Sequence, residues 1–206
     1  GVASDFQMAG TAYTGSMANL NTLRDNSMAD DLHRHSELSA SDGTPDQALL
    51  IDGSGYITQS AQPACLVGIV TTIVDVTGNN NTYHPVWDTE VYDFASNFSS
   101  TKFTAPVTGK YEVDISLLYA GLTTSHTTVT AFINTSNRKY IFGVSNLANV
   151  KDVNDQAHVG QSMLVDMDAL DTLAVATTVT NGTLVVDLNG NGATDLRCYL
   201  SVALKQ

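Results

Sequence analysis

From residue 64 to residue 204 the sequence consists of short runs of β-branched and apolar residues separated by turn residues, recurring at intervals of roughly 10 to 15 residues. In residues 110–117 polar and apolar side chains alternate, as in a strand with one buried face. About eight to ten such runs, with no convincing helix between them, predict a β-sandwich. The expected strands are 64–76, 83–92, 98–103, 110–117, 129–133, 139–144, 158–165, 173–179, 184–188 and 196–204.

Three of these runs carry more specific expectations. Residues 64–76 are nearly continuous in apolar and β-branched residues, which predicts one strand buried on both faces. Residues 184–188 and 196–204 flank an Asn-Gly turn, which predicts that these two strands form a β-hairpin.

The composition changes near Pro63. Residues 1 to about 60 are rich in Ala, Met, Asn, Asp and Ser and carry two basic against eight acidic side chains. Apolar residues in 17–38 have a loosely helical spacing, and turn-forming sequences follow. We therefore predict an extended, partly helical N-terminal attachment arm at 1–60 and a β-sandwich head at 61–206. The few apolar side chains of the arm are expected to be buried against a partner.

The chain carries 9 basic and 21 acidic residues, a formal net charge of −12. Nucleic-acid binding draws its affinity from clustered Lys and Arg, so this charge argues against a nucleic-acid partner and against an anionic membrane surface. No stretch approaches the ~20 consecutive apolar residues that a membrane-spanning helix needs. We expect neither nucleic acid nor membrane among the partners.

One string in the head carries a family resemblance. Phe103, Ala105, Pro106, Gly109 and Tyr111 follow the pattern Phe-x-Ala-Pro-x-x-Gly-x-Tyr, which resembles the hinge between two middle strands in the jelly-roll head of the tumour necrosis factor group and the complement q-subunit globular domain. Pro106 withholds an N–H and ends one strand, and Gly109 permits a tight turn. Phe103 and Tyr111 are then expected to pack across the corner.

Weaker matches to the same family occur in the family's order, and together they cover about two-thirds of the chain. They are 62–66, 87–93, 97–98, 170–173 (where Leu170 replaces the usual Gly) and 198–204. The resemblance implies a jelly-roll β-sandwich and a compact homotrimer, in which one edge of each sandwich is buried around a threefold axis.

The resemblance also implies that the first and last strands of the head are neighbours, which would bring Cys65 and Cys198 close together. Two interpretations stay open for this pair. The cysteines are either two buried small hydrophobic residues or the two halves of a cross-strand disulfide.

The arm and head together resemble bacteriophage virion proteins, in which this jelly roll occurs in fibre tips and capsid decorations. The resemblance lies in the style of residues 25–30, 33–38 and 50–58. It implies a virion-surface location and a partner such as the major capsid protein or another virion protein, bound through the arm.

Two sequences could bind metal. Asp187, Asn189, Asn191 and Asp195 place oxygen ligands as in the front half of a calcium loop, although Cys198 stands where such a loop has its bidentate Glu. The alternative is a hairpin turn whose Asn-Gly pairs supply positive φ. The second is the pair His33 and His35, for which a solvated pair is the alternative to a metal site on the threefold axis.

The remaining polar residues do not favour an enzyme. Asp166 and Asp168 are expected at a solvated strand edge rather than as a glycosidase pair. No phosphate-binding loop, dinucleotide fingerprint, zinc set or activated nucleophile can be recognised, so we predict a non-enzymatic protein without cofactors, with calcium as the one ion to consider.

Three functions are therefore considered. The first is a trimeric capsid decoration (cement) protein held by its N-terminal arm. The second is a phage fibre tip or adhesin that binds host surface glycans through distal loops, with aromatic residues near Tyr83, Trp87 or Tyr140. The third is a secreted complement-like recognition domain, which would need a signal peptide upstream of Gly1.

Overall fold

The computed structural model describes residues 7–8, 11–12, 50–51, 57–58 and 62–205. The chain divides into two compact units, residues 1–59 and 60–206. In the first unit, β1 (Gln7–Met8) pairs with β2 (Thr11–Ala12), and β3 (Leu50–Ile51) pairs with β4 (Ile57–Thr58), both antiparallel. The predicted helical segment at 17–38, including His33 and His35, lies outside the described residues.

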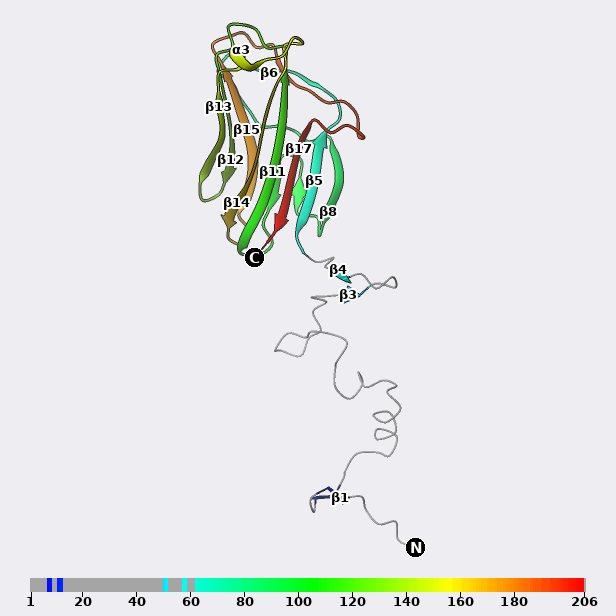
Figure 1. Cartoon of the computed structure of the whole chain (residues 1–206). Helices are drawn as coiled ribbons and strands as arrows, with labels where there is room; N and C mark the ends of the chain where they lie inside the picture. The colour runs from blue at the N-terminus through cyan, green and yellow to red at the C-terminus, as the bar shows by residue number, and fades with distance from the viewer. Residues whose placement is uncertain (1–6, 9–10, 13–49, 52–56, 59–61, 206) are drawn as a thin grey trace. The chain divides into compact units, whose positions relative to one another are not determined.

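The second unit is a sandwich of two antiparallel sheets (Figure 1). In sheet I, β11 pairs with β14 along one edge and with β17 and β16, end to end, along the other. β17 then pairs with β5, β5 with β8, and β16 with β6. The strands of sheet I are β5 (Ala64–Ile69), β6 (Ile73–Thr77), β8 (Thr89–Phe94), β11 (Gly109–Ala120), β14 (Ala157–Met167), β16 (Val186–Leu188) and β17 (Cys198–Leu204).

Sheet II has the order β13-β12-β15-β10-β9, and β7 pairs with the far end of β15. Its strands are β7 (Thr82–Tyr83), β9 (Phe98–Ser99), β10 (Lys102–Thr104), β12 (Thr128–Thr135), β13 (Lys139–Ser145) and β15 (Thr172–Thr180). One helical turn, α3 (Leu147–Val150), follows β13. The prediction of a mainly β jelly-roll sandwich is confirmed, and the first and last strands of the head, β5 and β17, lie side by side as expected.

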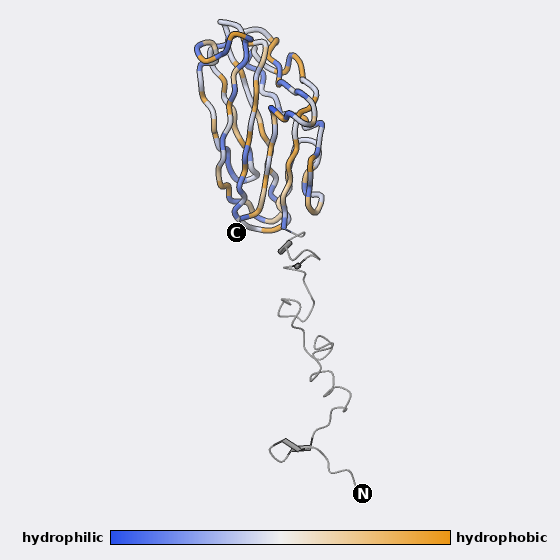
Figure 2. Tube along the Cα trace, turned by 45° about the vertical axis from the view of Figure 1, so that its right-hand side comes forward, coloured by the Kyte–Doolittle hydropathy of each residue, from blue (hydrophilic) through white to orange (hydrophobic). Residues whose placement is uncertain are grey.

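The core lies between the two sheets. Buried and partly buried residues alternate along much of β11 and β17, whereas β15 has five buried residues in a row, and apolar and polar residues mix along the strands in Figure 2. A fully buried polar contact joins the sheets through this core. The Tyr119 hydroxyl on β11 lies 2.6 Å from Thr177 Oγ1 on β15. Thr177 Oγ1 in turn donates a hydrogen bond to the Thr130 carbonyl at 3.4 Å. Each buried hydroxyl therefore has a partner, as buried polar groups require.

The predicted hinge is confirmed in its main contact. The rings of Phe103 and Tyr111 meet edge to face, with centroids 5.6 Å apart, and the Tyr111 hydroxyl donates to the Val107 carbonyl at 2.7 Å. Gly109 begins β11 opposite Met167, and its φ is not in the left-handed region, so the turn does not use that freedom of glycine.

Four predictions about strands are wrong. Residues 83–92 divide between β7 and β8, which lie in different sheets, and residues 98–103 divide between the paired strands β9 and β10. Residues 64–76 form two strands, β5 and β6, rather than one, because the Asp88 carboxylate accepts hydrogen bonds from the N–H groups of Val70 (2.7 Å) and Thr71 (3.0 Å) and so ends β5. The strands predicted at 184–188 and 196–204 do not form a hairpin. Both pair with β11, one after the other along the same edge.

The two cysteines are buried and free, which confirms the first interpretation of this pair and excludes the disulfide. The expectation that they lie close together is wrong. Cys65 lies opposite Val202 and Cys198 lies opposite Ile69, because each cysteine is near the start of its strand and the two strands are antiparallel. Four residues of strand, about 13 Å at 3.3 Å per residue, therefore separate them.

Within the described ranges, no helix has the length and apolar character needed to cross a membrane.

Candidate interaction surface

The outward face of sheet I is open over β14, β11, β17, β5 and β8. α3, with four residues, is the only helix in the part of the chain that the structure describes, so no helix covers this face. Antiparallel register places directly opposite residues on the same face of a sheet, which gives three rows across this surface. The rows are Phe94-Ala64-Ala203-Glu112-Leu164, Tyr92-Leu66-Ser201-Asp114-Ser162 and Gly68-Tyr199-Ser116-Gly160.

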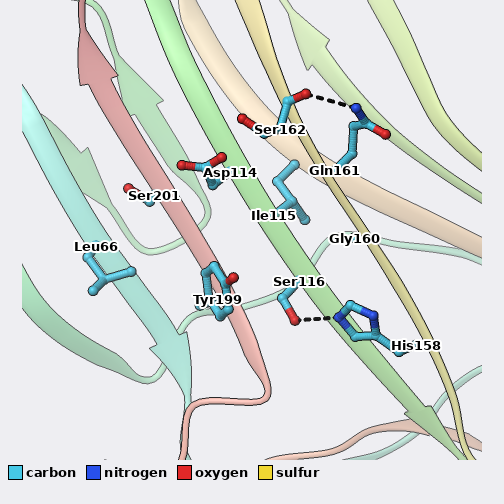
Figure 3. Close-up of a pocket in the computed structure, with 10 residues that line it drawn as sticks. All are labelled: Leu66, Asp114, Ile115, Ser116, His158, Gly160, Gln161, Ser162, Tyr199 and Ser201. Atoms are coloured by element: carbon cyan, nitrogen blue, oxygen red, sulfur yellow. Dashed lines mark hydrogen bonds between the residues drawn. The ribbon is translucent and has the colours of Figure 1, made fainter.

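A hollow of about 690 Å³ lies in the middle of this face (Figure 3). Small residues form much of its floor, because Ser116, Gly160, Ser162 and Ser201 fill little of the space between larger neighbours. Tyr199, Leu66 and His158 are among those neighbours. The hollow is therefore a consequence of side-chain size on a regular sheet, and another chain could approach the backbone closely here.

Ser116 and His158 in this hollow have the residue types of a nucleophile and its base, but the directions of their hydrogen bonds do not allow His158 to act as that base. Ser116 Oγ donates its single proton to the Arg197 carbonyl at 2.7 Å. His158 Nε2, 2.8 Å from the same oxygen, must therefore be the donor to it. A histidine that donates to the hydroxyl cannot take its proton, so the pair fixes β14 to β11 and does not activate the serine.

Large apolar side chains lie at both ends of the first row and at the β8 end of the second. Leu164 on β14 is 60% exposed, and on β8 the rings of Tyr92 and Phe94 stack with centroids 5.2 Å apart while Phe94 stays 48% exposed. Large exposed apolar side chains next to a hollow are typical of a surface that another protein covers.

The outward face of sheet II has a different character. Threonines lie on β7, β12 and β15 of this face, and Thr82 Oγ1 and Thr178 Oγ1 lie 2.8 Å apart. On β12 the Phe132 ring is covered by Lys139, whose Nζ lies 3.5 Å from the ring centroid. On β13 the apolar side chains of Ile141 and Val144, opposite Phe132 and Thr130, are 57% and 65% exposed. The face of sheet I differs from it by the larger hollow, whose lining mixes polar and apolar side chains.

The residues predicted for calcium lie around Arg197. Its guanidinium donates to Asn189 Oδ1 (3.3 Å) and to the Asp195 carboxylate (3.2 Å), and Asn191 also donates to Asp195. Asp187 accepts from the Asp75 N–H at 2.8 Å. In the described ranges no group of three or more His, Cys, Asp and Glu side chains could hold a metal ion. A calcium site built with the two asparagines stays a prediction.

Asp166 is part of an exposed cluster on the strand edge. It accepts hydrogen bonds from the Tyr140 hydroxyl (2.6 Å) and from Arg138. These hydrogen bonds, Tyr140 first, lower the pKa of Asp166 to about 2. The neighbouring Asp168 takes no part in either hydrogen bond.

The three aromatic residues predicted on distal loops do not form an exposed cluster. Trp87 is 6% exposed and belongs to the core. Tyr83 on β7 and Tyr140 on β13 are only partly exposed and pack against that core. The exposed aromatic pair is Tyr92 and Phe94, on β8.

No pattern in the sequence points directly to the hollow. Alternation in 110–117 does place Glu112, Asp114 and Ser116 on one face, but which strands lie beside them depends on long-range pairing. The pairing of β11 with β14 brings His158, Gly160 and Ser162 next to that row.

Comparison with known proteins supports no assignment by sequence. No family model matches the chain, and no curated protein matches it. Solved structures do resemble it. Murine APRIL matches at 11% identity, covering 70% of this chain and 99% of that one, with a TM-score of 0.46.

The globular domain of the zebrafish complement 1qA protein matches at 12% identity, over 70% of this chain and 98% of its own, with a TM-score of 0.46. Eiger TNF from S. frugiperda matches at 13% identity, over 71% and 94%, with a TM-score of 0.48. The strand order of the chain itself defines a jelly-roll β-sandwich head.

Proposed function

We propose that the head assembles as a homotrimer through the outward face of sheet I, and that the trimer is a non-enzymatic surface protein of a virion. In this proposal the protein decorates the capsid and is held there by residues 1–60. The observation that carries the proposal is the hollow of small residues bordered by exposed apolar side chains.

A second copy of the chain is the occupant that fits this face best. The hollow and the β8 aromatic pair form one continuous surface across five strands, which suits the broad contact of a protein better than a small ligand. Protein interfaces have an apolar, charge-poor centre and a polar rim. Tyr199, Ser116 and Ser201 line the centre of this face together with a single carboxylate, that of Asp114. Glu112, Lys110 and Lys205 lie at its border.

The arm supports attachment rather than enzymatic activity. It carries eight acidic and two basic side chains, and we expect its few apolar side chains to be buried against a partner. Three such arms on one trimer would bind neighbouring coat subunits together, and their linkage would raise the overall affinity well above that of one arm.

The trimer is tested by blocking the hollow. We expect the wild-type chain to elute in size-exclusion chromatography with light scattering at three times its mass of 21.9 kDa. Ser201→Arg should shift the mass towards 21.9 kDa, because a long charged side chain would occupy the hollow. Thr130→Arg, on the outward face of sheet II, is the matched control and should remain trimeric. A Ser201→Arg variant that stays trimeric would contradict the proposed interface.

The arm is tested separately by deleting residues 1–60. The remaining head should stay folded and trimeric but no longer sediment with particles that lack their own copy of the protein. Particle binding by the isolated head would refute the role of the arm.

The second candidate function, a fibre tip or adhesin that binds host glycans, is favoured by one observation on the head. A polar hollow lies on the outward face of sheet II, which the proposed trimer leaves open.

A further inference from the structure

The second hollow, of about 320 Å³, lies where three strands of sheet II meet. Lys102 on β10, Ala174 on β15 and Asn134 on β12 lie directly opposite one another in register. The side chains of Lys102 and Asn134 both extend further from the sheet than the methyl group of Ala174, so a notch forms between them. The outer two strands are about 10 Å apart, twice the spacing of neighbouring strands.

The polar groups of the notch divide into two sets. Ser136 and Thr135 are used by the local turn, because Ser136 Oγ accepts from the Thr172 N–H at 2.8 Å and Thr135 Oγ1 donates to the Arg138 carbonyl at 3.1 Å. Lys102 and Asn134 belong to the second set. Their side chains form no hydrogen bond or ion pair with any residue that the structure describes.

The third wall of the notch is His84. Its Nδ1 donates to the Val175 carbonyl at 3.1 Å, since a carbonyl can only accept. That bond orients the ring and leaves Nε2 for a further partner. Lysine, amide and imidazole groups with unused hydrogen-bonding capacity therefore converge on one small space.

The charge of this space contrasts with that of the whole chain. None of the eight residues that line it is acidic, whereas the chain carries a net charge of −12. Among the residues that the structure describes, Arg138, Lys151, Arg197 and Lys205 are in ion pairs, whereas Lys102, Lys110 and Lys139 are not. Asp171, next to Thr172, already accepts from Asn137 Nδ2 and from the Asp168 N–H.

We propose that this notch binds a sugar that carries a carboxylate. The Lys102 ammonium would pair with the carboxylate, and Asn134 and His84 would bind neighbouring hydroxyls, which both donate and accept as these side chains do. Ala174 leaves room for the ring itself. The volume is at the lower end of ligand sites in proteins and suits one sugar unit. A long polyanion would be repelled by the net charge of −12 that the whole chain carries.

Calorimetric titration of the full-length protein tests this proposal with two sugars that differ in one group, methyl glucuronide and methyl glucoside. We expect the glucuronide to bind with a Kd of about 1 mM, because a ligand with so few atoms can make only a limited number of contacts. The glucoside should bind at least about tenfold more weakly. Lys102→Gln should weaken glucuronide binding about tenfold, since it removes a charge-assisted hydrogen bond. Asn134→Ala should weaken the binding of both sugars.

Lys110→Gln is the matched control, because it removes the same charge from β11 on the other sheet, and it should bind the glucuronide as the wild type does. Thermal unfolding establishes that each variant is folded. Equal binding of the two sugars, no binding at 10 times the expected Kd, or an unchanged affinity in Lys102→Gln would overturn the proposal. Sodium acetate that displaces the sugar at equal concentration would also overturn it, because the notch would then be an anion site only.

This proposal does not depend on the trimer. The notch is on sheet II, and a monomeric Ser201→Arg variant should bind the sugar as the wild type does.

Discussion

His126 is fully buried, and its two ring nitrogens have different hydrogen-bond roles. The Thr123 N–H donates to Nδ1 at 2.9 Å, whereas Nε2 lies 3.1 Å from the Thr183 carbonyl and must donate to it. The imidazole is therefore neutral with its proton on Nε2, and it joins the loop after β11 to the loop after β15. Gly182 makes this possible, because a Cβ there would overlap the ring.

Gly182→Ala should lower the free energy of unfolding by about 1–3 kcal/mol, the usual cost of overpacking a buried site. Chemical denaturation monitored by tryptophan fluorescence measures this change. The same substitution in a His126→Ala background should cost much less, because the clashing ring is absent. Equal costs in the two backgrounds would show that the ring is not the cause.

Asp166 provides a prediction about pH. Its pKa is lowered to about 2 by the hydrogen bonds from Tyr140 and Arg138, against an ordinary value of 3.8. A group whose pKa is lower in the folded state stabilises the fold above its unfolded pKa, and this contribution is lost as the pH falls towards the folded pKa. The wild type should therefore have a higher denaturation midpoint than Asp166→Asn at pH 6, with the difference shrinking between about pH 4 and pH 2.

Asp168→Asn is the control for this series, because Asp168 shares neither hydrogen bond. A difference between wild type and Asp166→Asn that is constant from pH 6 to pH 2 would mean that the charge of Asp166 contributes nothing.

At the scale of the strands, much of the sandwich could be predicted from alternation alone. Residues 110–117 have a period of two and lie within β11, and the hinge between Phe103 and Tyr111 follows from its Pro and Gly spacing. The break between β5 and β6 could not be predicted, because it depends on a carboxylate 17 to 18 residues further along the chain. The separation of β16 from β17 likewise depends on β11, which pairs with both.

The antiparallel pairing of β5 with β17 gives a prediction about the two thiols. Burial raises the pKa of Cys65 to about 12, with Asp93 and Glu90 adding to it, and burial raises the pKa of Cys198 to about 11. Because the thiolate is the reactive form, neither cysteine should react with a disulfide reagent in the folded protein at pH 8. Both should react after denaturation without a reducing agent, and a single thiol or none would contradict the free, separated cysteines.

At the scale of the whole molecule, the two faces of the sandwich differ in what they offer a partner. The face of sheet I has a large hollow of small residues with exposed apolar side chains beside it, and the face of sheet II has a smaller notch that contains Lys102 and no acidic residue. The sequence shows which residues are present on these strands. It does not show which of them form each surface, because each surface brings together side chains from strands far apart in the chain. Ser116 and His158, and likewise Lys102 and Asn134, become neighbours only through pairing.

The central claim of this account is that three copies of the chain cover the outward face of sheet I. Sedimentation equilibrium of the wild-type protein over a wide range of concentrations tests it most directly. The account predicts one species of three times 21.9 kDa down to micromolar concentration. A mass of 21.9 kDa throughout that range would contradict it.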